Sequence, residues 1–217
     1  MYQLKILIKD FRPPIWRRVL IADEASFFDL HSLIQDIFDW EDYHLHAFCA
    51  VRNKGKQNIY IQNEETNDEW ASSLDDELLA PSEKRVLYRD ELATQLKEYL
   101  NEEFPHMTYE YDFGDSWDHQ IVLEKVLSLD NSMVTIVVTG KRLGPPEDSR
   151  GWIHSAEEIV KSNRNKRSVA WKELCDAYGD EAARDIALMC KDFLLVAFDV
   201  SEIEVTDPKE RLKLYES

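Results

Sequence analysis

The chain has 217 residues, 44% of them hydrophobic and 32% charged, with 43 acidic residues against 26 basic ones. Enough apolar side chains are present to form a packed core, so the composition excludes a wholly disordered protein. The formal net charge of −17 disfavours nucleic acid and anionic membranes as partners unless the basic residues cluster.

The N-terminal part of the sequence predicts a pair of strands followed by a helix. Polar and apolar residues alternate over Tyr2–Lys9 and again over Ile15–Ile21. Prolines separate the two runs, so we expect an antiparallel pair. Ser26 followed three residues later by Asp29 predicts a helix cap, and apolar residues at helical spacing extend this helix over Phe27–Phe38.

Further strands are predicted up to about residue 140. They cover Leu45–Val51, Asn58–Gln62, Thr108–Phe113, His119–Leu127 and Met133–Thr139. The acidic stretch Glu64–Glu83 contains no basic residue and predicts a solvated loop with a short helix; a surface for a cation or a basic partner is the alternative. A helix is expected over Leu92–Leu100, before Pro105.

The last third of the chain has the apolar spacing of helices. These are expected over Ser155–Ser162, Val169–Tyr178 and Asp180–Phe198, followed by a polar tail over Asp199–Ser217 that contains one strand or helix turn. The sequence shows no repeat and no low-complexity linker. It therefore predicts one α+β domain over residues 1–217, with a mostly antiparallel sheet in a strand-rich part (1–140) and a helix-rich part (153–198).

The sequence indicates a cytoplasmic protein without membrane contact. No run approaches the ~18 apolar residues of a membrane span, and the start of the chain alternates polar and apolar residues, unlike a signal peptide. Cysteines occur at Cys49, Cys175 and Cys190, widely separated and odd in number. This usage fits a reducing compartment and no disulfide framework.

Two histidines form the first candidate site. In a strand, His44 and His46 would point to the same face, which is the spacing that places two ring nitrogens on one metal ion. Ordinary hydrogen-bonded histidines are the competing interpretation. His31 lies at the helical spacing of Phe27 and Ile34, so we expect a hydrogen-bonded histidine that faces the core rather than a ligand.

The segment from Tyr111 to His119 is the densest polar cluster in the sequence. Its candidate binding residues are Asp112, Asp115, Trp117 and His119. They predict a cation site or an acid–base pair, although aspartates also accept backbone N–H bonds in turns. We expect Arg17 or Arg18 to contact this turn, because uncompensated carboxylates near a core are costly.

Two other segments offer binding groups. Glu147 and Asp148 follow two prolines and present adjacent carboxylates on a rigid turn. Trp16, Arg17 and Arg18 are candidates for a binding edge that recognises an anion. One basic cluster also occurs, at Lys161, Arg164, Lys166 and Arg167, where a solvated helix connection competes with a nucleic-acid patch.

The combination of motifs resembles the plasmid pRiA4b open-reading-frame-three-like family. The matching segments are Tyr2–Ile6, Pro13–Val19, Leu30–His31 with Ile34–Gln35, Trp40, His44–Phe48, Tyr111–His119 and Pro145–Asp148, with Asp199–Leu212 as a closing segment. The resemblance implies a single α+β domain of bacteria, archaea and mobile elements, some members being labelled resolvase-like transposon passengers. Gly144, Ser149 and Arg150 replace the Cys and Gly-Gly usual in the family, which disfavours a thiol-dependent role for that loop.

Two functions follow from these observations. The first is a binding or adaptor module for a protein or small-molecule partner, because the sequence lacks G-x-S-x-G, C-x-x-C and H-E-x-x-H motifs. The second is a metal-assisted hydrolase or nuclease-like enzyme that uses the acidic turns and histidines. A nucleic-acid role follows only from family labels. We expect no cofactor and no tightly bound transition metal, because the cysteines have unrelated spacings.

Overall fold

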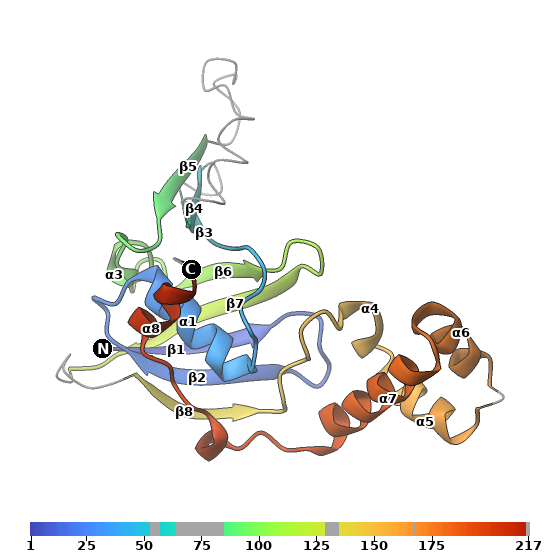
Figure 1. Cartoon of the computed structure of the whole chain (residues 1–217). Helices are drawn as coiled ribbons and strands as arrows, with labels where there is room; N and C mark the ends of the chain where they lie inside the picture. Colours follow the sequence, from blue (N-terminus) through green and yellow to red (C-terminus); the bar gives the residue numbers. More distant parts are fainter. Residues whose placement is uncertain (53–56, 64–84, 129–134, 167, 216–217) are drawn as a thin grey trace.

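The computed structural model of the chain describes residues 1–52, 57–63, 85–128, 135–166 and 168–215, and its centre is a large sheet (Figure 1). The strands of this sheet are β1 (Tyr2–Ile8), β2 (Ile15–Ile21), β3 (His46–Arg52), β4 (Gln57–Gln62), β5 (Arg85–Asp90), β6 (His106–Tyr111), β7 (Trp117–Val126) and β8 (Ile136–Lys141). Their order is β5-β4-β3-β6-β7-β1-β2-β8. Every neighbouring pair is antiparallel except β4 and β5. The predicted α+β class with a mostly antiparallel sheet is therefore confirmed.

The register follows from the alternation in the sequence. In β1 and β2, the residues at every second position are buried and those between them are half-buried, as a sheet with one face on the core requires. All of the buried residues are apolar except Arg17. Tyr2 pairs with Ile21 and Ile8 pairs with Ile15, so the proline-containing turn closes a regular antiparallel pair. This predicted pair has the expected bounds except at Lys9.

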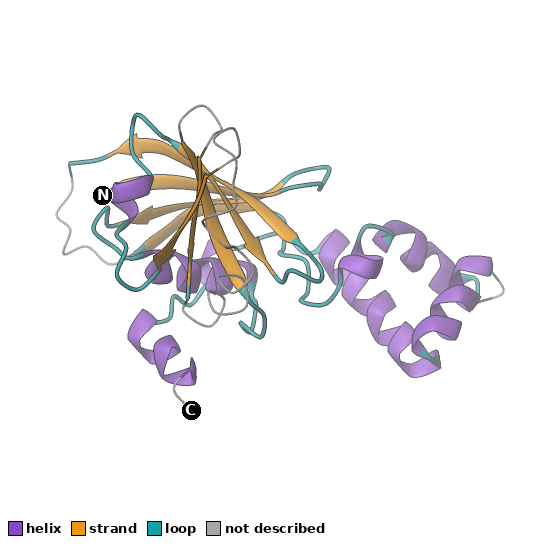
Figure 2. Ribbon diagram, turned by 90° about the horizontal axis from the view of Figure 1, so that it is seen from above, coloured by secondary structure: helices purple, strands orange, loops and turns teal. Residues whose placement is uncertain are grey.

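Helix α1 (Phe27–Phe38) covers the core side of the sheet. Ser26 accepts the backbone N–H of Asp29, and Asp29 accepts the backbone N–H of Ser26, which completes the predicted capping box. Helix α8 (Pro208–Tyr215) lies beside α1 on the same side of the sheet (Figures 1 and 2). The sequence predicted at most one strand or helix turn there, because α8 is short and has no clear apolar stripe.

Four other helices form a group at one end of the sheet (Figure 2). They are α4 (Arg150–Ile153), α5 (Ala156–Arg164), α6 (Val169–Tyr178) and α7 (Asp180–Leu195). Phe11 joins the two parts: its ring lies 6.3 Å from that of Trp117 in the sheet core and 5.9 Å from that of Phe193 on α7. The buried residues of both parts belong to one contiguous hydrophobic cluster. That all 217 residues form a single domain stays a prediction.

Several expected elements differ from the observed ones. Strand β6 ends at Tyr111 rather than Phe113, because Asp112 has a positive φ of 55° and starts the turn. The predicted helix Leu92–Leu100 is reduced to the short α3 (Leu96–Tyr99), and β5 was not predicted. The acidic stretch Glu64–Glu83 lies outside the described residues. So do residues 53–56 between β3 and β4, the first residues of the strand predicted over Met133–Thr139, and Arg167.

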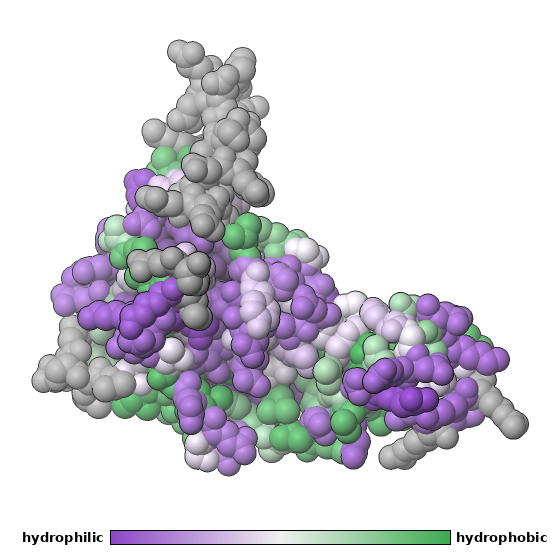
Figure 3. Space-filling view, in the orientation of Figure 1, coloured by the Kyte–Doolittle hydropathy of each residue, from purple (hydrophilic) through white to green (hydrophobic). Residues whose placement is uncertain are grey.

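The surface seen in Figure 3 is hydrophilic over α1 and α8 and carries hydrophobic residues along the edge where β8 runs. Ile136 and Val138 of this last strand of the sheet are 39% and 42% exposed. Among the described residues, the structure contains no helix with the length and apolar composition that a membrane crossing requires.

Candidate functional site

The connection between α1 and β3 organises the candidate site. Asp39 and Asp42 both have positive φ, which turns the chain sharply twice in four residues. The Trp40 indole N–H then donates to the Pro145 carbonyl at 2.8 Å, and the Glu41 backbone N–H donates to Glu147 Oε2 at 2.7 Å. The connection is thereby held against the loop that follows β8.

His44 precedes β3 and reaches two of the predicted carboxylates. Its Nε2 lies 3.0 Å from Asp148 Oδ1 and 3.7 Å from Asp112 Oδ2, and the three side chains are 29%, 70% and 11% exposed. His44, Asp112 and Asp148 are called the surface triad below. Three segments far apart in the sequence bring their ligand atoms within 4.8 Å of one another.

Backbone geometry holds the two carboxylates of the surface triad. Asp112 and Asp148 both have a φ of 55°, a region that non-glycine residues rarely occupy and that clusters at functional sites. The other carboxylate oxygen of Asp112, Oδ1, accepts the Gly114 N–H at 3.0 Å. Gly114 itself has no positive φ.

Glu147 fixes the loop beside the triad. Its Oε1 accepts the hydroxyl of Tyr111, whose ring stacks on Trp40 with ring centroids 5.0 Å apart. Burial, followed by the hydrogen bond to Glu147, raises the pKa of Tyr111, so its hydroxyl stays protonated. This loop lies close to the end of α1: a Cβ on Gly144 would lie 2.4 Å from the Phe38 carbonyl oxygen. Gly144 therefore suits this place through its size.

The other candidates of the Asp112–His119 turn do not join the triad. Asp115 accepts the Arg150 backbone N–H at 3.0 Å and so links the turn to α4. Trp117 is fully buried, which rules out the predicted role on a binding surface. His119 is also fully buried; its Nδ1 lies 2.8 Å from the Trp117 carbonyl oxygen, and burial lowers its pKa to about 3.

The predicted binding edge contributes no side chain to the surface triad. This edge comprises Trp16, Arg17 and Arg18. Arg17 is buried and donates from Nε to the Ile37 carbonyl at 2.8 Å. Arg18 pairs with Glu124 at 2.5 Å and lies over the Trp16 ring. Among the described residues, neither arginine forms an ion pair with a carboxylate of the Asp112–His119 turn. That expectation was wrong, because alternation turns Arg17 into the core and Arg18 to the opposite face.

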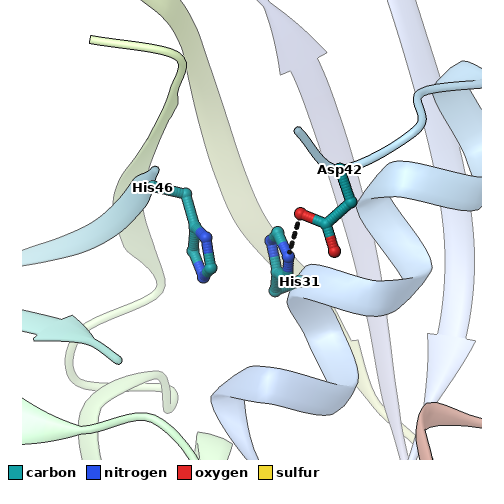
Figure 4. A group of neighbouring side chains, drawn as sticks. All are labelled: His31, Asp42 and His46. Atoms are coloured by element: carbon teal, nitrogen blue, oxygen red, sulfur yellow. Dashed lines mark hydrogen bonds and ion pairs between the residues drawn. The ribbon is translucent and has the colours of Figure 1, made fainter. Parts of the chain in front are cut away.

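The predicted common face of His44 and His46 is not observed. It would have required both residues to lie in one continuous strand. Because β3 begins only at His46, this ring enters the core and stacks on His31, with centroids 3.5 Å apart and planes 2° from parallel. His31 Nε2 lies 2.9 Å from Asp42 Oδ1, and His46 Nε2 lies 2.7 Å from Glu91 Oε2. His31, Asp42, His46 and Glu91 are called the buried cluster below; Figure 4 shows three of them.

The buried cluster has several partners outside it. Tyr109 bonds His31 Nδ1 at 2.8 Å, and the α8 residues Tyr215 and Arg211 both contact Asp42. Burial, followed by the charge of His46, lowers the pKa of His31. Burial alone would raise the pKa of Glu91, but the charge and hydrogen bond of His46 outweigh it, so the net shift is downward.

The sequence predicted a hydrogen-bonded core histidine at position 31, and the structure places one there. It did not reveal the partners. Asp42, Glu91 and Tyr215 come from a tight connection, a turn and a short helix, none of which has a periodic pattern. Asp42 alone carried a local indication, because aspartate is a common turn residue that tolerates a positive φ.

Chemically, the surface triad offers one imidazole and two carboxylates near solvent, a donor set that suits a divalent cation with open coordination positions. The buried cluster offers two imidazoles and two carboxylates away from solvent. The seven histidine and carboxylate candidates from the sequence therefore do not all lie in one place. Three form the triad, Glu147 lies beside it, and His46, Asp115 and His119 lie elsewhere.

Comparisons with known proteins agree with this architecture. The chain is 24% identical over 181 residues to the uncharacterized protein y4hQ of Sinorhizobium fredii, a match that covers 83% of this chain and 74% of that protein. It is also similar to the crystal structure of a protein of unknown function, MM3350, from Methanosarcina mazei Go1. That match has a TM-score of 0.61 and 31% sequence identity and covers 96% of this chain and 94% of the other. A profile described as plasmid pRiA4b ORF-3-like protein matches residues 1–202, and the chain therefore belongs to this family.

Proposed function

We propose that the protein is a binding module whose surface triad holds a divalent cation and presents it to a partner. The observation that carries the proposal is the convergence of His44, Asp112 and Asp148 from three separate segments to within 4.8 Å. Three protein ligands leave positions of a six-coordinate ion such as Mn²⁺ open to water or to an oxygen of the partner.

A cavity whose wall includes Glu147, the residue before Asp148, supports a binding role. It has a volume of about 520 Å³ and lies between the loop that carries Glu147 and helix α7. Its wall combines apolar side chains with carboxylates: Phe38, Leu143, Pro146, Met189 and Phe193 with Asp39, Glu41, Glu147 and Asp192. A partner that coordinates the ion through one oxygen can therefore place an apolar or positively charged portion in this cavity.

Titration calorimetry with Mn²⁺ tests the proposal. We expect the unaltered protein to bind Mn²⁺ and the double variant His44→Ala, Asp148→Ala to bind it at least ~10-fold more weakly, a change of about 1.4 kcal/mol. Asp192→Asn is the matched control, because this exposed carboxylate lines the cavity but lies outside the triad. Its affinity should stay close to that of the unaltered protein. Equal affinities in all three proteins, or no binding at all, would refute the proposal.

Metal-assisted hydrolysis is the second candidate function. It is favoured by His44, which is close enough to both carboxylates to ligate the same ion while the side chain remains partly exposed. We expect such an activity to appear as Mn²⁺-dependent turnover of a simple phosphodiester, and to be lost in the double variant. Turnover by the unaltered protein would show that it is a hydrolase rather than a binding module.

The family labels also suggest an association with mobile elements and hence with DNA. The surface charge disfavours direct contact with phosphates, since the formal net charge is −17. Of the basic cluster, Lys161 pairs with Glu157 at 3.3 Å and Lys166 lies over the Trp171 ring. These contacts fit a solvated helix connection. A DNA-binding measurement with and without Mn²⁺ would detect an interaction that the ion bridges.

A further inference from the structure

The buried cluster has a charge imbalance that its protein groups do not remove. Asp42 and Glu91 are almost completely inaccessible to solvent, with side chains 3% and 2% exposed. Arg211 contacts Asp42, but it is bonded more closely to Asp36. These three carboxylates and one guanidinium leave two negative charges to be balanced where water is excluded.

Two protons on the imidazoles would balance the charge only at a cost. The rings of His31 and His46 are parallel and 3.5 Å apart, so two imidazolium ions would face each other at van der Waals distance and repel. One imidazolium avoids this repulsion but leaves one negative charge uncompensated, and two neutral imidazoles leave both. A bound divalent cation satisfies both conditions, because neutral imidazoles are its ligands.

We propose that His31, His46 and Asp42 bind one divalent transition-metal ion of the zinc type, with Glu91 as the carboxylate that orients His46. The ligand atoms of these three residues already lie within 4.8 Å of one another. Bonds of about 2.0–2.2 Å to zinc bring such atoms to about 3–3.5 Å apart. An ion bonds in the plane of each imidazole, so His46 must rotate out of its parallel stack on His31, while His31 keeps its bond to Tyr109. This site is independent of the surface triad and of the proposed function.

The surroundings have the features of a second coordination shell. Tyr109 bonds Nδ1 of His31, and Gln35 donates to the Tyr109 hydroxyl at 3.1 Å, so the ring orientation of His31 is fixed from behind. In the tautomer that carries its proton on Nδ1, His31 donates to Tyr109 and presents the lone pair of Nε2 toward Asp42. The contact between His46 and Glu91 is of the histidine–carboxylate kind that commonly supports metal sites.

Helix α8 covers the cluster. Tyr215 donates its hydroxyl to Asp42 Oδ2 at 2.7 Å and lies 3.3 Å from His31 Nε2, while Arg211 contacts both Asp36 and Asp42. An ion in this place is therefore shielded from solvent, and we expect it to be released slowly to a chelator. An ion on the surface triad should exchange rapidly.

Cobalt binding tests the site, because Co²⁺ substitutes for Zn²⁺ and its visible absorption reports the donor geometry. The protein is stripped with a chelator, loaded with Co²⁺ and passed through a desalting column. We expect one retained Co²⁺ per chain, with the intense visible bands of a four- or five-coordinate ion. The double variant His44→Ala, Asp148→Ala should retain the same ion and spectrum, which separates this site from the surface triad.

The variant His46→Gln removes one ligand and should lose the retained ion while the double variant keeps it. Circular dichroism establishes that His46→Gln is folded. If this variant does not fold, the spectrum of the double variant decides. Loss of Co²⁺ from the double variant, a weak spectrum of the six-coordinate type, or an unchanged spectrum in folded His46→Gln would each overturn the proposal. Failure of Mn²⁺ to bind the surface triad would leave it intact.

Discussion

Two adjacent arginines of strand β2 lie in opposite environments, one in the core and one on the other face of the sheet. Arg17 and Arg18 are adjacent in β2, yet the Arg17 side chain is enclosed between Phe38 and Phe198 and Arg18 lies on the other face. Burial lowers the pKa of Arg17 to about 9, so the guanidinium is still largely protonated at neutral pH. The period of two in a strand explains this division, but only the structure shows that Arg17 bonds a helix carbonyl.

Replacement of these arginines should therefore have unequal effects on the free energy of unfolding. Arg17→Ala removes the hydrogen bond to the Ile37 carbonyl and leaves a cavity beside Phe198, and should cost about 2–4 kcal/mol. Arg18→Ala breaks only a partly exposed ion pair with Glu124 and should cost less than ~1 kcal/mol. Urea denaturation of both variants gives the comparison. Losses of similar size would contradict the assignment of Arg17 to the core.

Secondary-structure elements with a complete local pattern were predicted with the correct bounds. Helix α1 has both a capping box and an apolar stripe in the sequence, and α6 has a regular apolar spacing. The connections that carry the surface triad have neither a capping box nor a regular apolar spacing. Asp112 and Asp148 reach His44 through turns with positive φ, whose directions depend on contacts such as Trp40 with Pro145. Convergence of these side chains was therefore not predictable from periodicity.

The cap of α1 allows a prediction with an internal control. Ser26→Ala removes the acceptor of the Asp29 N–H and should lower the free energy of unfolding by about 1 kcal/mol. Ser155 occupies the corresponding position of α5 but makes no side-chain cap bond, so Ser155→Ala should change stability by less than ~0.5 kcal/mol. Thermal or urea unfolding measures both. A Ser155→Ala loss as large as that of Ser26→Ala would show that the capping bond is not the cause.

At the scale of the whole molecule, stability should decrease in mild acid. The pKa of buried His119 is about 3 in the folded protein, whereas an unfolded histidine titrates near ~6.5. Between these values the unfolded chain binds more protons than the folded one. The stabilising contribution is therefore complete above pH ~6.5 and is lost as pH falls toward ~3, with a slope of up to about 1.4 kcal/mol per pH unit.

The variant His119→Gln tests this dependence, because it cannot take up the proton in either state. Urea unfolding between pH ~6.5 and ~5 separates the histidine effect from that of Asp42 and Glu91, whose pKa values lie lower. We expect a shallower decline in the variant than in the unaltered protein. Parallel declines would show that another group controls acid stability.

The overall architecture followed from patterns that span many residues, and the site did not. Alternation and helical spacing predicted the α+β class and the mostly antiparallel sheet, since each strand and helix must bury one face. Glu91 of the buried cluster and its partner Tyr215 come from segments whose place is decided by tertiary packing. The predicted arginine contact with the acidic turn was wrong because alternation in β2 places Arg17 in the core and Arg18 on the opposite face.

Anomalous diffraction from crystals grown with Mn²⁺ would show directly whether the surface triad holds a cation. We expect an anomalous peak within bonding distance of His44, Asp112 and Asp148, with further coordination positions filled by water or ligand oxygens. The same crystals of the His44→Ala, Asp148→Ala variant should lack this peak. A map of the unaltered protein with Mn²⁺ elsewhere and none at the surface triad would contradict the proposed cation site.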